Sequence, residues 1–153
     1  SAGTILGAAQ MQWLLDAHVT CTARSTLFCT SVLFTGASAA IWGGFPKDRD
    51  ALLSAIKERQ IDGVIFLTAD AHYAAVVRVP DNSALREVIV GPLAAPMGKA
   101  SGAANQFEYF NNQFLNYGLV SVHADGGTSY VEIEILTDKN VLLHKVRVDA
   151  REK

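Results

Sequence analysis

The sequence predicts an α/β domain in which a βαβ-like unit is followed by antiparallel strands. Two short runs rich in β-branched and aromatic residues, Thr26–Phe34 and Val64–Thr68, are typical of buried strands. Between them, Asp48–Arg59 has apolar residues at helical spacing, and Pro46 lies where a first helical turn would begin. A strand, a helix and a strand in this order usually form a parallel pair in one sheet.

One helix precedes this unit and further strands follow it, so that the second half has α+β character. Leu6–Ala17 repeats apolar residues at helical spacing and predicts the helix. The later strands are predicted at Ala74–Val79, Arg86–Val90, Tyr117–His123, Ser129–Leu136 and Val141–Val148. Ser129–Leu136 alternates strictly between apolar and polar residues, so one of its faces should be exposed to solvent.

The segments between these strands contain turn-forming residues. We expect a turn at Pro80–Asn82 and a hairpin turn at Asp138–Asn140. Gly91–Ala104 is rich in Gly, Ala and Pro and is predicted to be a loop. Asn105–Asn116 is rich in aromatic and amide residues, and its pattern assigns it to no element.

Composition excludes several classes of protein. A chain of 153 residues, half of them hydrophobic, fits one domain with a substantial core. No apolar run reaches the roughly 20 residues of a membrane-spanning helix. The net charge is -2 with scattered Lys and Arg, so we expect no nucleic-acid-binding surface. Cys21 and Cys29 leave a disulfide open, but we expect free thiols, with Cys29 buried inside a strand.

The polar segment after the strand Val64–Thr68 carries the clearest candidate chemistry. It contains Asp70 and His72, two residues apart, and functional groups collect at the carboxyl ends of strands in open α/β sheets. If the backbone is extended there, both side chains can face one cleft, where a carboxylate and an imidazole are ordinary ligands of Zn, Fe or Mn. The alternative is that Asp70 caps a short helix and His72 is a buried polar residue.

Several spaced motifs resemble those of the PhoD-like alkaline phosphatases. The segment FLTADAHYAA resembles the family's T-G-D-x-H signature, which ends in Tyr or Phe. Leu6–Ala17 resembles its L-G-x-x-Q-x-x-W-L helix, and Trp42–Leu53 resembles a W-x-G-F/Y-x-x-x-R segment. Phe110–Val122 and the final hairpin are similar to its closing strands. The resemblance therefore covers nearly the whole chain in the family's order.

This resemblance implies a fold, a chemistry and a set of site residues. The family has the calcineurin-like metallophosphoesterase fold, two packed β-sheets with helices outside, and a two-metal centre that hydrolyses phosphate monoesters and diesters. Asp70 and His72 would then be metal ligands for Ca, Fe, Zn or Mn, with Tyr73 beside them and Trp42 and Arg49 shaping the cleft wall. Members are commonly exported, which implies a periplasmic or secreted setting and a phosphate ester substrate.

Two departures from the family pattern limit what we expect of this chain. Ala69 stands where the signature has Gly, and its Cβ is costly if that position needs a positive φ. The family's earlier motifs, an Asp-rich strand end, a G-D-x-x-Y segment and a D-H-E segment, are absent and would lie upstream of Ser1. We therefore expect residues 1–153 to form a single domain that corresponds to the C-terminal part of such a phosphatase.

The missing motifs lead to expectations about activity and assembly. A two-metal site needs roughly four to six protein ligands. Beyond Asp70 and His72 the chain offers only His18, His123 and His144, which we expect to be ordinary polar residues. We expect an incomplete site with little activity in the isolated chain; the alternative is a non-catalytic binding or assembly module. Exposed sheet edges should favour a homodimer or the missing N-terminal part as partner.

Overall fold

The computed structural model describes residues 3–61, 63–80, 82, 84–100, 106–125 and 128–150. Its elements, in chain order, are α1 (Gly7–Thr20), β1 (Thr26–Cys29), the 3-10 helix η1 (Trp42–Gly44), α2 (Pro46–Glu58), β2 (Val64–Thr68), β3 (Ala74–Arg78), β4 (Arg86–Ile89), β5 (Phe107–Asn111), β6 (Asn116–Asp125), β7 (Thr128–Thr137) and β8 (Leu142–Asp149). No helix in the described part of the chain is long and apolar enough to cross a membrane.

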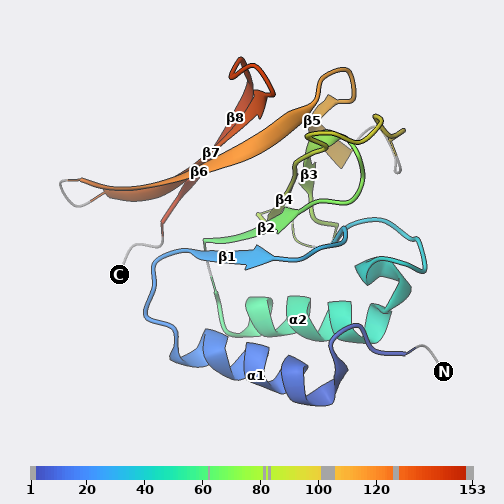
Figure 1. Ribbon diagram of the computed structural model, residues 1–153. Helices are drawn as coiled ribbons and strands as arrows, with labels where there is room; N and C mark the ends of the chain where they lie inside the picture. The colour runs from blue at the N-terminus through green and yellow to red at the C-terminus, as the bar shows by residue number, and fades with distance from the viewer. Residues whose placement is uncertain are drawn as a thin grey trace.

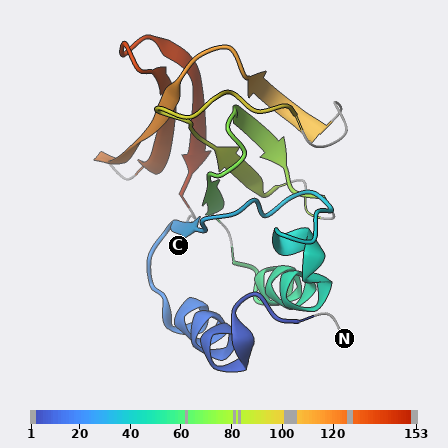
Figure 2. The same ribbon diagram turned by 45° about the vertical axis from the view of Figure 1, so that its right-hand side comes forward.

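The strands form two sheets, and the helices cover one of them. The first sheet has five strands in the order β1-β2-β4-β3-β5, and the second has three in the order β6-β7-β8. Strands β1 and β2 are parallel, as the βαβ pattern predicted. Strand β4 is also parallel to β2, whereas β3 runs antiparallel to β4 and β5. Helices α1 and α2 lie on one face of the first sheet and the second sheet lies on the other (Figures 1 and 2). The predicted mixed α/β architecture with two packed sheets is confirmed.

The helical layer is fixed to the first sheet by apolar packing and by one buried carboxylate. Met11 and Leu14 of α1 meet Leu52 of α2 and Phe66 of β2 in one hydrophobic cluster. Asp48 lies in the first turn of α2, and only 6% of it is exposed. Its Oδ2 accepts hydrogen bonds from the backbone amides of Ile5 (2.9 Å) and Leu6 (3.3 Å), so the start of α2 holds the start of α1 in place.

The second sheet confirms the predicted alternation and hairpin. Val131, Ile133 and Ile135 of β7 face the first sheet and are at most 2% exposed. The glutamates between them lie on the outer face, where Glu132 and Glu134 both pair with Lys145 of β8. The turn from β7 to β8 contains Asn140 with a φ of +62°, a left-handed conformation that Asn tolerates.

The structure corrects the length and burial predicted for the first strand. The predicted strand Thr26–Phe34 ends at Cys29, and the amide of Phe34 bonds to the side chain of Glu87. Cys29 was predicted to be buried, and this is wrong: Cys21 and Cys29 are both exposed free thiols. The reason is that β1 is an edge strand, so nothing in the described chain pairs with its outer side.

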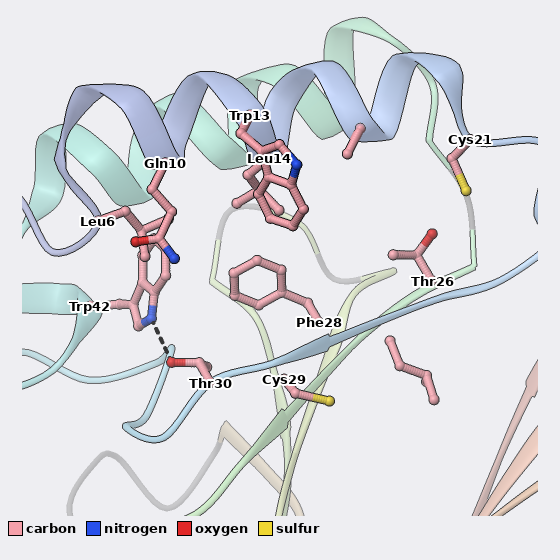
Figure 3. A pocket seen from close by; sticks show the side chains of 12 residues that line it. Leu6, Gln10, Trp13, Leu14, Cys21, Thr26, Phe28, Cys29, Thr30 and Trp42 are labelled. Atoms are coloured by element: carbon pink, nitrogen blue, oxygen red, sulfur yellow. Dashed lines mark hydrogen bonds between the residues drawn. The ribbon is translucent and has the colours of Figure 1, made fainter.

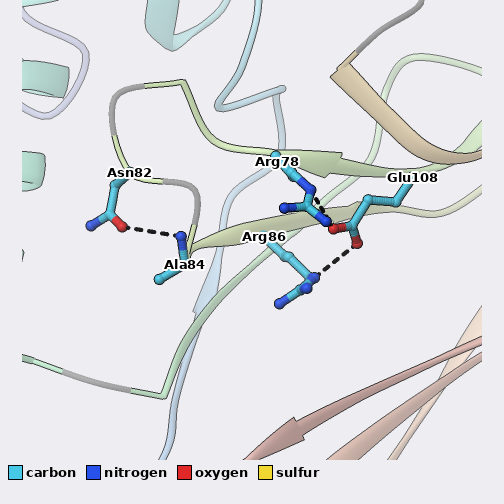
Figure 4. A network of polar contacts seen from close by, with 5 residues as sticks. All are labelled: Arg78, Asn82, Ala84, Arg86 and Glu108. Carbon is cyan, nitrogen blue, oxygen red and sulfur yellow. Dashed lines mark hydrogen bonds and ion pairs between the residues drawn. The ribbon is translucent and has the colours of Figure 1, made fainter.

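Strand β5 lies in the stretch to which the pattern assigned no element. It pairs with β3. On the other side of β3, Arg78 stands directly opposite Arg86 of β4, and this like-charge pair alone would be unfavourable. Glu108 of β5 bonds to both guanidinium groups, 2.7 Å from Arg78 Nε and 2.8 Å from Arg86 Nε (Figure 4). Partial burial acts to raise the pKa of Glu108, but Arg86 and Arg78 together lower it.

The other boundaries differ by a few residues, as is usual at the ends of elements. Helix α1 continues past the predicted end to Thr20, and β6 extends from Asn116 to Asp125. The predicted turn at 80–82 and the predicted loop at 91–104 connect elements as expected where the structure describes them, whereas Asp81 and residues 101–105 lie outside the described residues.

Candidate active site

The parallel strands of the first sheet bring three loops together at their carboxyl ends. Strands β1, β2 and β4 run in the same direction, so these ends lie on one side of the sheet, which is where ligands bind in open α/β sheets. The loops that follow them are residues 30–41, 69–73 and 90–100. Asp70 and His72 lie in the second of these loops, directly after β2, and both are exposed. Their position at the end of a buried strand is as predicted, and their role as ligands stays a prediction.

The backbone around the two residues is not the extended chain that the spacing suggested. Asp70 has a φ of +71° and His72 a φ of +57°, so both adopt the left-handed region. Asp and His enter this region more readily than most side chains do, and such conformations cluster at functional sites. Ala69 does not have a positive φ. The substitution of Ala for the family's Gly therefore carries no penalty of this kind.

The loop after β4 holds this segment in its strained conformation. The amide of Gly98 donates a hydrogen bond to the carbonyl oxygen of His72 (2.6 Å). A Cβ on Gly98 would overlap the carbonyl oxygen of Ala71 and lie 3.1 Å from the Cβ of His72, so only glycine allows this approach. Asn112 Nδ2 in turn donates to the carbonyl oxygen of Gly98 (3.2 Å). The position of His72 is thus set by two other segments of the chain.

One hydrogen bond orients the His72 ring. Its Nδ1 lies 3.0 Å from the carbonyl oxygen of Pro96. Because a carbonyl oxygen can only accept, Nδ1 must carry the proton, and in the neutral imidazole Nε2 then carries the lone pair. A backbone carbonyl that fixes the tautomer in this way is the usual arrangement behind a metal-binding histidine. The ring is therefore prepared to bind a cation through Nε2.

A buried carboxylate connects the loop after β1 to the end of β2. Glu87 of β4 is fully buried. Its Oε1 accepts from the amide of Phe34 (2.8 Å) and the hydroxyl of Thr68 (2.7 Å), and its Oε2 accepts from the amide (2.9 Å) and the hydroxyl of Thr35. All four partners are donors, which suits an ionised carboxylate. Glu87 thereby joins the loop after β1 to the last residue of β2.

Sequence reasoning missed Glu87, although a signal was present. It directly precedes the apolar residues Val88–Val90 in the predicted strand Arg86–Val90. A carboxylate in such a strand must find several donors, because an unpaired buried charge is very unfavourable. The pattern could therefore have identified a structural carboxylate, but not its partners on a distant loop.

The three residues expected to shape the cleft lie in different surroundings. Tyr73 is 1% exposed and packs against Phe110, with ring centroids 5.2 Å apart. Trp42 is also 1% exposed, belongs to the cluster beneath the helices, and donates from Nε1 to the hydroxyl of Thr30 (3.1 Å). Arg49 is half-buried, with its guanidinium carbon 5.7 Å from the Phe34 ring centroid. Trp42 and Tyr73 thus support the loops after β1 and β2 from within, and a role in the cleft wall stays a prediction.

The other histidines do not join Asp70 and His72. The ring of His123 stacks on Tyr130 with centroids 4.4 Å apart, and the ring of His144 stacks on Tyr109 with centroids 4.3 Å apart. Both histidines lie on strands of the second sheet. Burial lowers the pKa of His144, and the charge of Glu108 opposes this only in part. His18 lies in α1, and its side chain is outside the described residues. Within the described ranges, no three His, Cys, Asp or Glu side chains are grouped so that they could hold a metal ion.

The loop offers some of the ligands that a metal ion needs. An exposed carboxylate and an imidazole with a free Nε2 are two suitable ligands for a divalent cation. Two protein ligands leave most of the coordination sphere to water or to other groups. Whether Asp70 and His72 bind a metal ion therefore stays a prediction.

Comparisons with known proteins agree with the fold described above. Residues 1–138 match the family model described as PhoD-like phosphatase. Alkaline phosphatase D of Bacillus subtilis (strain 168) is 30% identical over 79 residues, which cover 45% of this chain and 14% of that protein. A solved structure described as "Structure of PhoD" aligns with a TM-score of 0.60 at 16% identity, over 94% of this chain and 35% of that one. The chain thus spans about a third of the solved relative and shares its fold.

Proposed function

The chain belongs to the PhoD-like phosphatase family, and from that premise we propose that it supplies part of a metal-dependent phosphoesterase centre. The substrate class is phosphate monoesters or diesters. The observation that carries the proposal is the fixed ring of His72, whose Nδ1 faces the Pro96 carbonyl oxygen and whose Nε2 is thereby available as a ligand, in the same loop as the exposed carboxylate of Asp70. Membership of a phosphatase family supports phosphoester hydrolysis in general.

Each residue of the loop has a defined task in this proposal. Metal ions bound here would neutralise phosphate oxygens and lower the pKa of a bound water so that it can attack phosphorus. Asp70 and His72 would hold the cation, Pro96 orients the imidazole, and Gly98 fixes the backbone of His72. Glu87 positions Thr68 and with it the start of the loop.

Completion of the centre requires ligands from outside the described pair. In the described part of the chain, Asp70 and His72 have no third potential ligand grouped with them. A centre with two metal ions needs roughly four to six protein ligands, so the isolated chain should hold metal weakly. The remaining ligands would come from a polypeptide that carries the rest of a PhoD-like fold. We therefore propose that this chain contributes part of the metal centre of a larger enzyme.

Activity assays test this proposal in two steps. The isolated chain should release almost no nitrophenol from p-nitrophenyl phosphate or bis(p-nitrophenyl) phosphate with added Ca, Mn, Zn or Fe. A chimera of the solved PhoD, in which this chain replaces the region that aligns with 94% of it, should be active. In that chimera, Asp70→Asn or His72→Ala should lower kcat/KM by at least the ~10–100-fold that loss of an outer-shell partner of a metal ligand causes.

The exposed carboxylate of Asp149 provides the control, because Asp149→Asn removes a charge at the end of β8 in the second sheet, where it pairs only with the exposed Arg147 among the described residues. Its effect should be within about twofold, as for most exposed ion pairs. Robust turnover by the isolated chain would contradict the incomplete site. An active chimera that tolerates both Asp70→Asn and His72→Ala would contradict the ligand roles and favour a non-catalytic assembly module.

A further inference from the structure

Buried side chains hold the loops that follow the parallel strands. In the loop after β1, the hydroxyl of Thr30 accepts a hydrogen bond from Nε1 of Trp42, drawn as a dashed line in Figure 3. The same loop is bound further along by the carboxylate of Glu87. The loop after β4 carries the contacts that orient His72, and it is held by a different group. That group is the side-chain amide of Asn116, the first residue of β6.

Asn116 is fully buried, and its side chain is bound through both its oxygen and its nitrogen. Its Oδ1 accepts from the amide of Gly91 (2.8 Å), and its Nδ2 donates to the carbonyl oxygens of Gly91 (2.9 Å) and Phe114 (3.0 Å). Its backbone amide donates to the carbonyl oxygen of Pro92 (2.8 Å). A carboxylate lacks the donors of this set, and an apolar side chain lacks all of it. Asn116 thus fixes the chain just after β4.

The far part of the same loop is held from the same region of the chain. Residues 112–115 connect β5 to β6, and Nδ2 of Asn112 donates to the carbonyl oxygen of Gly98 (3.2 Å). Gly98 in turn donates to the carbonyl oxygen of His72. Pro96, whose carbonyl oxygen faces Nδ1 of His72, lies between the two anchored positions. The two asparagines therefore hold the piece of chain that sets the ring of His72.

The sheet topology explains how this connection reaches the candidate site. Strand β3 begins at Ala74, just after the loop that carries His72, and runs antiparallel to β5. Ala74 pairs with Asn111, the last residue of β5, so β5 ends at the same end of the sheet as β2. Oδ1 of Asn111 accepts from the amides of Gln113 (3.0 Å) and Phe114 (3.3 Å), which closes a tight turn there. The connection after β5 is therefore a further segment beside the loop of His72.

We propose that Asn116 and Asn112 are positioning residues for His72 in the proposed metal centre. They hold the loop after β4 so that the carbonyl oxygen of Pro96 keeps the proton on Nδ1, which leaves Nε2 of the ring open to a cation. Without these anchors the carbonyl oxygen can move away, and an exposed imidazole in water prefers its proton on Nε2. The purpose of this arrangement rests on the proposed function, whereas the tautomer can be measured without a metal.

Long-range ¹H–¹⁵N spectra of the metal-free chain report the tautomer of His72. In the parent chain the proton should be on Nδ1. Asn116→Leu keeps the branching of the side chain but removes its hydrogen bonds, so the larger share of the proton should move to Nε2. In a Zn²⁺ titration of the same samples, the affinity at His72 should fall by about tenfold, the lower end of the range for outer-shell partners of metal ligands.

Thr137→Val is the matched control. Thr137 stands opposite Asn116 on β7 and is 6% exposed, and its hydroxyl accepts from the amides of Lys139 (3.2 Å) and Val141 (3.1 Å). Loss of this hydroxyl should loosen the turn between β7 and β8 and lower the free energy of unfolding, because the two amides lose their acceptor. The tautomer of His72 should stay as in the parent chain.

Asn112→Ala keeps the proposal testable if Asn116→Leu does not fold. It removes the part-buried hydrogen bond to the carbonyl oxygen of Gly98 and leaves the contacts of Asn116 in place. The proton of His72 should shift in the same direction as in Asn116→Leu, but to a smaller extent. A ring unaffected by Asn112→Ala would then decide against the proposal.

The other results separate this proposal from the metal site itself. A folded Asn116→Leu variant in which His72 keeps its Nδ1 proton would overturn the proposal, even if Zn²⁺ still binds at Nε2. An equal change of tautomer in Thr137→Val would also overturn it, because a general loss of stability would then explain the shift. A tautomer that responds to Asn116→Leu but not to Thr137→Val supports the positioning role, including in a chain whose Nε2 does not respond to Zn²⁺, where only the metal site is contradicted.

Discussion

Replacing Glu87 with alanine is expected to lower the free energy of unfolding by about 3–5 kcal/mol. The carboxylate is fully buried and accepts hydrogen bonds from two backbone amides and two hydroxyls. Alanine would leave these donors without partners and open a cavity between the loop after β1 and the end of β2. Urea denaturation at neutral pH measures the effect. The loss should also loosen the start of the Asp70 loop, because Thr68 would lose its acceptor.

Two further variants make this prediction specific. Thr68→Val removes a single donor to the carboxylate and should have a smaller effect of about 1–3 kcal/mol, so it remains informative if Glu87→Ala does not fold. Glu132→Ala on β7 removes a glutamate of similar size whose partner, Lys145, is 43% exposed, and should change stability by no more than about 1 kcal/mol. An effect of Glu87→Ala no larger than that of Glu132→Ala would show that the network contributes little.

The second large effect is expected for Gly43→Ala. A Cβ at Gly43 would overlap the carbonyl oxygen of Gly36 and lie 2.8 Å from its carbonyl carbon and 3.2 Å from Ala37 Cα. These are backbone atoms that cannot rotate aside, so the turn that carries Trp42 would have to move away from the loop after β1. We expect a loss of about 3 kcal/mol or more, the upper range for overpacking, and a melting temperature lower by about 5–10 °C.

Gly3→Ala is the matched control for this substitution. A Cβ at Gly3 would meet only Phe45 Cε1, at an ordinary contact distance of 3.8 Å. Both variants are measured by differential scanning calorimetry. Gly3→Ala should have a melting temperature close to that of the parent chain. Equal melting temperatures for the two variants would mean that the loop of residues 36–44 opens without strain.

The sequence predicted those elements whose pattern is local. Val64–Thr68 is apolar at nearly every position and forms β2, and the strict alternation of Ser129–Leu136 is reproduced in β7. Strand β5 was not predicted because its residues are aromatic and amide-rich, and its conformation is decided by pairing with β3. Burial of Cys29 was predicted wrongly for a similar reason, since the position of β1 at an edge depends on the whole sheet.

The candidate site was predicted by position and not by conformation. The sequence predicted that Asp70 and His72 directly follow a buried strand, and the structure has them in the loop after β2. Their left-handed backbone could not be predicted, because it depends on Gly98 and Pro96, which are more than twenty residues away in sequence. The carboxylate of Glu87 was missed for the same reason, since its partners belong to loops that meet only in the fold.

We propose that the loop after β2 presents Asp70 and the Nε2 of His72 together to a cation. Long-range ¹H–¹⁵N spectra of the histidines during a Zn²⁺ titration measure this binding at single nitrogen atoms. Metal-free His72 should be protonated at Nδ1, and Zn²⁺ should shift its Nε2 while the resonances of His123 and His144 stay in place. Asp70→Asn should weaken that shift. A His72 ring protonated at Nε2, or Zn²⁺ binding that leaves its Nε2 unchanged, would show that the loop does not present this pair to a cation.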